Sequence, residues 1–262
     1  KQFREEISPY FNANPKKYIS ALVSEDCWQA TPGKVVDLVR NLGIAAGGTV
    51  MEDCRVLEAC REGKYTSVLV QTHDKKYVEY RTEHFVNALG SGAGKLCDSM
   101  GIDAGLYPVR HQAFITRRLP MLGKHGTNLD MLIDRQDYKG FSAVYGQQIA
   151  YTGQIIGFAS PKLDAMRIDK NLKVNTKAFL EIVSEMFSEW IPDLAGVGIQ
   201  AVWAGYYTEP RYIVDPELGL FVGMRGHGFM LSQYIARMYV DKLLGRPVPE
   251  YFEKLKLNGP GL

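Results

Sequence analysis

The sequence has no long apolar run and no excess of charge of one sign. No stretch approaches the roughly 18 consecutive apolar residues that a membrane helix needs. No apolar run near the start follows a basic segment, as it would in a signal peptide, so we expect a cytoplasmic protein without a membrane partner. Thirty-one Lys and Arg residues are balanced by 29 Asp and Glu residues. This balance leaves no basic surplus for tracking phosphates, which argues against nucleic acid as a partner.

Cysteine is scarce, and its spacing matches no binding motif. Cys27, Cys54, Cys60 and Cys97 form no CxxC pair, which indicates neither a zinc site nor a disulfide framework. We therefore expect reduced thiols and no bound metal. The 262 residues are 46% hydrophobic and 11% aromatic, which excludes general disorder and provides for a large core. This length suits one large domain or two interleaved domains.

The first hundred residues change from an irregular to a regular pattern. Residues 1–25 contain two prolines and Asn-rich turns, which predict an irregular connector. A Pro at the first helical position and spaced apolar residues then predict a helix that is capped by Thr31 and stops at Gly43. Alternating patterns predict strands, the middle two forming a hairpin, at 50–58, 67–72, 77–81 and 85–89.

The rest of the sequence combines a strand-rich middle with two helices. Gly and Asn turns separate four segments that predict a mostly antiparallel sheet: 109–118, 130–136, 141–147 and 154–160. Apolar residues at helical spacing predict a helix behind a cap at Asn175/Thr176, ended by Pro192. Short strands are expected at 199–207, 211–215 and 219–224, and a last helix over 229–245. The whole pattern predicts an α/β (α+β) fold.

The segment NALGSGAGKL, residues 87–96, joins a predicted strand to a helix through a glycine-dense turn. Such a turn presents backbone N–H groups and a helix N-terminus, an arrangement that binds phosphate or lies against a cofactor. The segment does not match the GxxxxGK[ST] loop, because Leu89 stands at the first glycine and Leu96 follows the lysine. An ordinary tight turn between strand and helix is the alternative.

A second glycine turn, RGHG, follows the predicted strand at 219–224. His227 lies between Gly226 and Gly228, where a ligand can approach the backbone closely. The helix that starts near Phe229 directs the positive end of its dipole at this turn, which favours an anionic group there. A packed structural histidine is the alternative for His227.

Several motifs, in their order along the chain, resemble the flavin-dependent D-amino-acid oxidase superfamily, the group that contains glycine oxidase and sarcosine oxidase. The motifs are VNALGSGAG, PVRHQ, WAGYYT, GHGFM and GRPVP, and the resemblance covers nearly all of the chain. It implies a partial FAD-binding Rossmann-like domain interleaved with a mostly antiparallel-sheet substrate domain. The implied segments are a connector (1–25), a middle part of the FAD domain (26–106), a substrate-binding domain (107–204) and a C-terminal part of the FAD domain (205–262).

The resemblance implies an FAD-dependent oxidoreductase that oxidises an amine or amino acid. A hydride would pass from the carbon next to nitrogen to flavin N5, leaving an imine that water hydrolyses, and no acid or base residue need be assigned if the amine binds neutral. The expected cofactor-binding residues are Val56, Gly90, Gly205, Gly226, His227, Gly228, Phe229 and Met230. Tyr145, Tyr206 and Tyr207 are the candidates for contact with the substrate, with a core role for any of them as the alternative.

Three positions depart from the patterns of the relatives. Gly205 stands where sarcosine-oxidase-like members have the cysteine that tethers flavin, so the FAD is expected to be non-covalent. Met230 stands where those members have a lysine for the substrate carboxylate, and Tyr207 where glycine-oxidase-like members have an arginine. Both usual cationic anchors are therefore absent, although an arginine elsewhere could serve.

The family's GxGxxG turn, which receives the pyrophosphate of the dinucleotide, is missing from the sequence, as is the acidic residue that follows it. Roughly the first third of a full enzyme is thus expected to lie outside this chain, either removed from a longer protein or carried by a separate chain. We expect weak or no FAD binding by this chain alone. The other hypothesis is a non-catalytic fragment or subunit that never holds FAD by itself.

Overall fold

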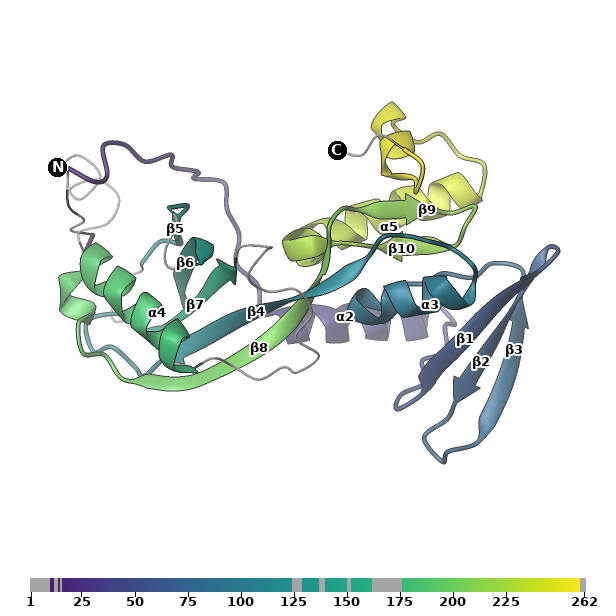
Figure 1. Ribbon diagram of the computed structural model, residues 1–262, viewed down its shortest axis with the longest axis horizontal. Coiled ribbons are helices and arrows are strands. Elements are labelled where there is room, and N and C mark those ends of the chain that lie inside the picture. Colours follow the sequence, from purple (N-terminus) through teal and green to yellow (C-terminus); the bar gives the residue numbers. More distant parts are fainter. Residues whose placement is uncertain are drawn as a thin grey trace. The chain divides into compact units, whose positions relative to one another are not determined.

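The computed structural model describes residues 10–11, 14, 16–123, 129–136, 140–149, 152–161 and 176–259. The chain divides into two compact units, each built from two separate stretches of sequence (Figure 1). The first unit comprises Lys1–Ser24 and Val109–Tyr206, and the second comprises Glu25–Pro108 and Tyr207–Leu262. Helices and antiparallel sheets occur together, which confirms the expected α/β (α+β) class.

The first unit is built on a five-stranded sheet with the order β5-β6-β7-β4-β8. Its strands are β4 (Tyr107–Thr116), β5 (Leu132–Asp134), β6 (Phe141–Ile149), β7 (Gln154–Pro161) and β8 (Ile199–Glu209). The pairs β5–β6, β6–β7 and β7–β4 are antiparallel, as the alternating sequence predicts. Because alternate side chains point to opposite faces, Val144 of β6 and Ile155 and Ala159 of β7 are buried on one face.

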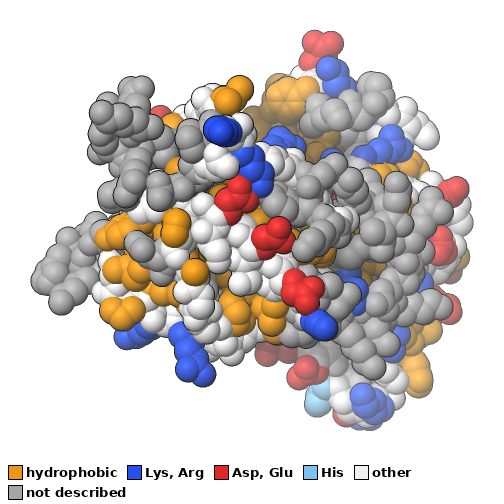
Figure 2. Space-filling model, turned by 60° about the vertical axis from the view of Figure 1, so that its left-hand side comes forward, with side chains coloured by type: hydrophobic (Ala, Val, Ile, Leu, Met, Phe, Trp, Pro, Cys, Tyr) orange, Lys and Arg blue, Asp and Glu red, His pale blue; other side chains and the backbone are white. Residues whose placement is uncertain are grey.

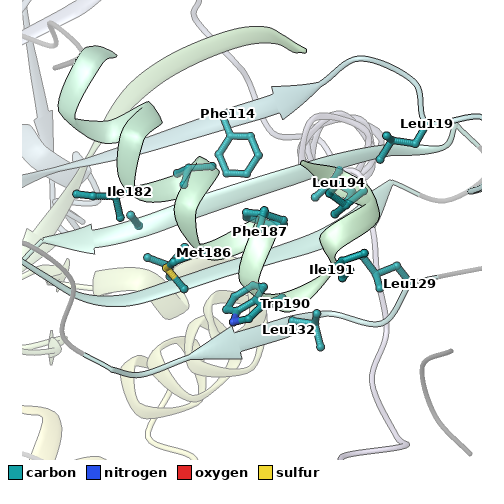
Figure 3. Close-up of a cluster of buried hydrophobic side chains, with 14 of the residues drawn as sticks. Phe114, Leu119, Leu129, Leu132, Ile182, Met186, Phe187, Trp190, Ile191 and Leu194 are labelled. Atoms are coloured by element: carbon teal, nitrogen blue, oxygen red, sulfur yellow. The ribbon is translucent and has the colours of Figure 1, made fainter. Parts of the chain in front are cut away.

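Helix α4 (Thr176–Trp190) covers that face of the sheet. Figure 3 shows its side chains, among them Met186, Phe187 and Trp190, meeting Phe114 and Leu132 from the strands. These side chains recur every three or four residues, so one side of the helix is apolar and becomes fully buried. A short 3-10 turn (η3, Pro192–Leu194) follows the helix. The predicted cap residue Asn175 lies outside the described residues.

The segment before residue 25 is tied to this unit by hydrogen bonds. The Tyr18 hydroxyl donates to the Asp134 carboxylate of β5 at 2.6 Å, and Trp190 Nε1 of α4 lies 3.3 Å from the same hydroxyl. Lys17 forms an ion pair of 2.7 Å with Glu189. The described residues of this segment contain turns but no helix or strand, and part of the predicted connector lies outside them.

The second unit begins with helix α2 (Pro32–Ala45), which has the expected Pro at its start. Thr31 takes the predicted N-cap position, although its side chain makes no capping hydrogen bond. The predicted end at Gly43 is wrong, because the helix continues to Ala45, just before Gly47 takes a left-handed φ of 94°. Helical hydrogen bonds simply continue through Gly43, since a glycine weakens a helix without breaking it. No residue of α2 is buried in this chain, and Leu38 is 58% exposed.

A three-stranded antiparallel sheet follows, formed by β1 (Arg55–Glu62), β2 (Tyr65–Gln71) and β3 (Tyr77–Thr82). The β2–β3 hairpin confirms the predicted one. Strand β1 begins later than the predicted residue 50, because Asp53 takes a positive φ of 53° that interrupts an extended chain.

The predicted strand at 85–89 is reduced to one parallel bridge between Asn87 and Leu220. The backbone of Asn87 donates to Gly219 and accepts from Phe221, while its buried side chain donates to the carbonyl of Ala93. These bonds fix the entry into a 3-10 turn (η1, Gly90–Gly92) and helix α3 (Ala93–Ser99). The Asn87 side chain therefore bends the chain into the turn where the apolar pattern alone predicts a longer strand.

The last part of the second unit is a hairpin followed by a helix. Strands β9 (Ile213–Asp215) and β10 (Leu220–Val222) pair antiparallel and lead through a 3-10 turn (η4, Arg225–His227) into α5 (Gly228–Leu243). Figure 1 shows α5 beside β9 and β10. Its buried side chains pack with Val214 and with Phe252 and Leu255 of a final 3-10 segment (η5, Glu250–Leu255).

The surface carries interspersed positive and negative side chains on the face that Figure 2 shows, with hydrophobic side chains among them. All four cysteines are free, in agreement with the expected reduced thiols. No helix in the described part of the chain is long and apolar enough to cross a membrane. Among those same residues, no group of three or more His, Cys, Asp or Glu side chains could hold a metal ion.

His111 of β4 gives this fold a testable pH dependence. Burial lowers the pKa of His111 to about 4 from its usual 6.5. As the pH falls, the unfolded chain takes up this proton first, so the free energy of unfolding should fall between pH 6.5 and 4, by about 3 kcal/mol. Urea unfolding at several pH values measures this slope. His111→Gln should remove that part of the slope and the exposed-site control His73→Gln should keep it, whereas equal slopes in both variants would contradict the assignment.

Candidate functional site

The glycine turn between β10 and α5 is held in a conformation that few sequences can adopt. Gly223 has a left-handed φ of 71°, and a Cβ atom there would lie 1.9 Å from the carbonyl oxygen of Arg211. The peptide N–H of His227 closes the turn by donating to the carbonyl of Met224 at 3.1 Å. Glycine is therefore required at position 223, since the neighbouring backbone fills the space of any side chain.

Helix α5 starts at this turn without a side-chain cap. His227 is the N-cap residue, and its side chain makes no capping hydrogen bond. The first N–H groups of a helix have no partner inside the helix, and here no side chain of the described chain caps them. Phe229 and Met230 in this first turn are exposed, Met230 by 70%. The helix start can thus receive an anionic group or a carbonyl oxygen.

An ion pair between Arg225 of the turn and the buried Glu209 of β8 holds the turn. Arg225 Nε lies 2.6 Å from Glu209 Oε2, and the Glu209 side chain is only 7% exposed. Arg225 also takes a left-handed φ of 49°, which is unusual for a residue with a side chain. A cation near a helix N-terminus opposes the helix dipole, and the carboxylate of Glu209 compensates that repulsion. Arg225 in turn compensates the cost of burying this carboxylate.

Tyr212 reaches the histidine of the turn. Its hydroxyl oxygen lies 2.6 Å from His227 Nδ1, and the two rings are 6.1 Å apart at 53°. Burial raises the pKa of the Tyr212 hydroxyl, while the charge of Arg225 lowers that pKa and the charge of Glu209 raises it. The net upward shift keeps the hydroxyl protonated at neutral pH.

The glycines on either side of His227 are closely packed. A Cβ at Gly226 would lie 2.9 Å from Cε2 of the Tyr207 ring, and one at Gly228 would lie 3.0 Å from Cβ of Met224. The structure therefore brings together Gly226, His227, Gly228 and Tyr207, with Phe229 and Met230 following in the first turn of α5. These residues include most of the cofactor site that the sequence predicts.

The other predicted cofactor residues lie on other elements. Gly90 starts the turn before α3 with a positive φ of 55°, and a Cβ there would meet no atom within 4 Å. Val56 of β1 is partly buried against the cluster of Ala59, Val68, Val70 and Leu96. Gly205 lies on β8 in the first unit, also with open space around it.

Two of the predicted substrate tyrosines belong to the first unit. Tyr145 of β6 stacks on Phe158 of β7, with ring centres 5.2 Å apart at 24°. Tyr206 is the last residue of the first unit, and Tyr207 is the first of the next stretch of the second unit. The grouping of Tyr145 and Tyr206 with the glycine turn stays a prediction.

Sequence reasoning missed Glu209, Tyr212 and Arg225. One signal was available for Arg225: a basic residue in a helix-starting turn opposes the helix dipole and so implies an acidic partner. Nothing in the sequence pattern selects Glu209 as that partner. The partnership depends on how β8 and the β9–β10 hairpin fold back to the turn.

The comparisons with known proteins identify the class of this chain. The family described as FAD dependent oxidoreductase (DAO) matches residues 3–242, and the chain belongs to this family. No curated protein sequence matches it.

Solved structures of similar fold include a dehydrogenase and two oxidases. An L-proline dehydrogenase from P. horikoshii has a TM-score of 0.66 and 24% identity over 86% of this chain and 59% of its own. A glycine oxidase from Geobacillus kaustophilus has a TM-score of 0.63 and 18% identity, over 82% of this chain and 54% of its own. An iminodiacetate oxidase from Chelativorans sp. BNC1 has a TM-score of 0.63 and 14% identity, over 87% of this chain and 58% of its own. The chain thus spans less than two thirds of the length of these structures.

The ion pair predicts a measurable loss of stability when its cation is removed. Arg225→Met leaves the buried Glu209 carboxylate without its partner, so we expect the free energy of unfolding to fall by about 1–3 kcal/mol, below the range for fully buried pairs because Arg225 is partly exposed. Urea unfolding of Arg246→Met, which breaks an exposed ion pair with Asp241, is the matched control and should show little change. Equal effects of the two substitutions would contradict a structural role for the pair.

Proposed function

We propose that this chain forms the C-terminal two-thirds of an FAD-dependent oxidoreductase that acts on an amine or amino acid. It would comprise the substrate-side part and the middle and C-terminal flavin-side parts. The observation that carries this proposal is the uncapped start of α5, where the exposed His227 stands between two closely packed glycines. When bound, FAD supplies the redox chemistry by accepting a hydride at N5 from the carbon next to the substrate nitrogen.

The residues at this turn fit the pyrimidine edge of a flavin, where negative charge develops on reduction. Peptide N–H groups in the first turn of α5, together with the positive end of its dipole, stabilise that charge. Gly226 and Gly228 carry no side chains, and Tyr207 and Met224 fill the space that side chains would need there, which holds the backbone of the turn in place. Val56 and Gly90 are proposed as further contacts of the cofactor in the same unit.

The proposed FAD is held without a covalent bond, because Gly205 offers no thiol. A substrate carboxylate would find no cation at Tyr207 or Met230. Arg225 is the arginine of the turn itself, but its Nε is engaged by Glu209. We therefore propose a substrate whose amine and apolar groups are recognised by Tyr145, Tyr206 and Tyr207, rather than one anchored by a carboxylate at positions 207 or 230.

We further propose that stable FAD binding needs a segment outside these residues, in the same protein or on a partner chain. The 262 residues contain no GxGxxG turn for the pyrophosphate. The apolar side chains of α2 are exposed in this chain, among them Val36, Leu38 and Leu42, as expected of a helix that another segment covers. The same two features also favour the second candidate function, a non-catalytic subunit or fragment that never holds FAD.

This proposal predicts weak or undetectable FAD binding by the chain alone. Calorimetric titration with FAD should give no affinity in the sub-micromolar range, because the pyrophosphate and ribose contacts are lacking. Sub-micromolar binding would mean that the turns at Gly90 and Gly226 suffice, and would remove the need for a further segment.

The protein joined to its missing segment should turn yellow, and acid precipitation should release all of the flavin into the supernatant. Flavin retained in the pellet would contradict non-covalent binding. A colourless, flavin-free assembly would favour the non-catalytic subunit.

A further inference from the structure

The hydrogen bond between Tyr212 and His227 joins two segments that are each fixed by their own backbone. Tyr212 directly precedes β9, whose Ile213 and Val214 are fully buried. His227 is held in the turn by the bond from its peptide N–H to Met224. The Oη–Nδ1 distance of 2.6 Å is therefore set by the hairpin and the turn.

The chemistry of the two groups decides which of them donates. A phenol is a stronger hydrogen-bond acid than a neutral imidazole N–H, and an imidazole nitrogen is a stronger base than a phenol oxygen. Tyr212 stays protonated, since burial raises the pKa of its hydroxyl. If Tyr212 donates, its only proton is used and His227 Nδ1 accepts. In the reverse arrangement the weaker acid, the imidazole N–H, would donate to the weaker base, the phenol oxygen.

We propose that Tyr212 is a positioning residue for His227: its hydroxyl donates to Nδ1 and so holds the imidazole proton on Nε2. This inference rests on the proposed function, in which the turn faces the flavin. His227 then presents a fixed N–H donor at Nε2 toward the bound group. The tautomer of a histidine is commonly set by the hydrogen bond at its other ring nitrogen.

The charged groups beside Tyr212 leave this bond intact. Glu209 and Arg225 both act on the Tyr212 hydroxyl, with opposite signs, and they neutralise one another through their ion pair. The tyrosine therefore faces a nearly neutral pair and keeps its proton for His227.

Nitrogen-15 NMR of the full chain tests the assignment without FAD. At neutral pH the His227 ring, assigned by comparison with His227→Gln, should show protonated Nε2 and unprotonated Nδ1, with a coupling from the Tyr212 hydroxyl proton to Nδ1. A wild-type spectrum with the proton on Nδ1 would overturn the proposal, even if no variant folds.

Two Tyr→Phe variants complete the test. Tyr212→Phe should mix the two tautomers of His227. Tyr234→Phe should leave the His227 signals unchanged, because the Tyr234 hydroxyl of α5 pairs with Tyr251 of η5. Unchanged His227 signals in Tyr212→Phe would overturn the proposal.

In the flavin-loaded protein, Tyr212→Phe should slow flavin reduction by up to about tenfold with little change in the substrate KM, the effect expected from one misplaced hydrogen-bond donor. An unchanged reduction rate in Tyr212→Phe, together with slower reduction in His227→Gln, would overturn the positioning role. If the turn does not face the flavin, Tyr212→Phe will still change the His227 tautomer, but His227→Gln will leave the reduction rate unchanged. Failure of the proposed function is thereby distinguished from failure of the positioning role.

Discussion

The candidate site depends on one ion pair, between the buried carboxylate of Glu209 and the partly exposed guanidinium of Arg225. Glu209, at the end of β8, is a carboxylate almost without solvent, and Arg225 is the cation that makes its burial tolerable. Arg225 takes a left-handed conformation in the η4 turn that precedes α5, and the carboxylate offsets the repulsion between its charge and the helix dipole. The position of Arg225 in turn sets the path of the two glycines and of His227. Together with Gly223 and the bond from the His227 N–H to the Met224 carbonyl, the ion pair holds the turn in one conformation.

Much of the fold could be predicted from the sequence because local pattern and tertiary packing agree there. Helix α4 buries the apolar side that its spacing predicts, and the β2–β3 hairpin alternates as a half-buried sheet should. The predictions failed where a single residue overrides the pattern. Asp53 takes a positive φ and delays β1, and Asn87 turns the chain away from the expected strand at 85–89. Such effects come from one backbone conformation or one side-chain hydrogen bond, which the periodicity of apolar residues does not predict.

The site was predictable only in part, for a related reason. Glycine spacing and the following apolar run point to a ligand-facing helix start at His227, because these properties are local. Tyr212 and Glu209 join the site through the return of β8 and the β9–β10 hairpin, which no local pattern encodes. The exposed apolar residues of α2 show a further limit of prediction from sequence. An amphipathic pattern predicts that one side of a helix is covered, but it does not predict which part of a protein covers it.

The central claim is that the turn from Gly226 to Met230 faces the flavin, and anaerobic stopped-flow reduction of the flavin-loaded protein tests it most directly. Rates are normalised to bound flavin for His227→Ala and Gly228→Val. For His227→Ala we expect full flavin occupancy with about tenfold to a hundredfold slower reduction, the range for one electrostatic donor. For Gly228→Val we expect reduced flavin occupancy, because a branched side chain would crowd Met224 and obstruct the ring. An unchanged rate in His227→Ala together with full occupancy in Gly228→Val would contradict the central claim.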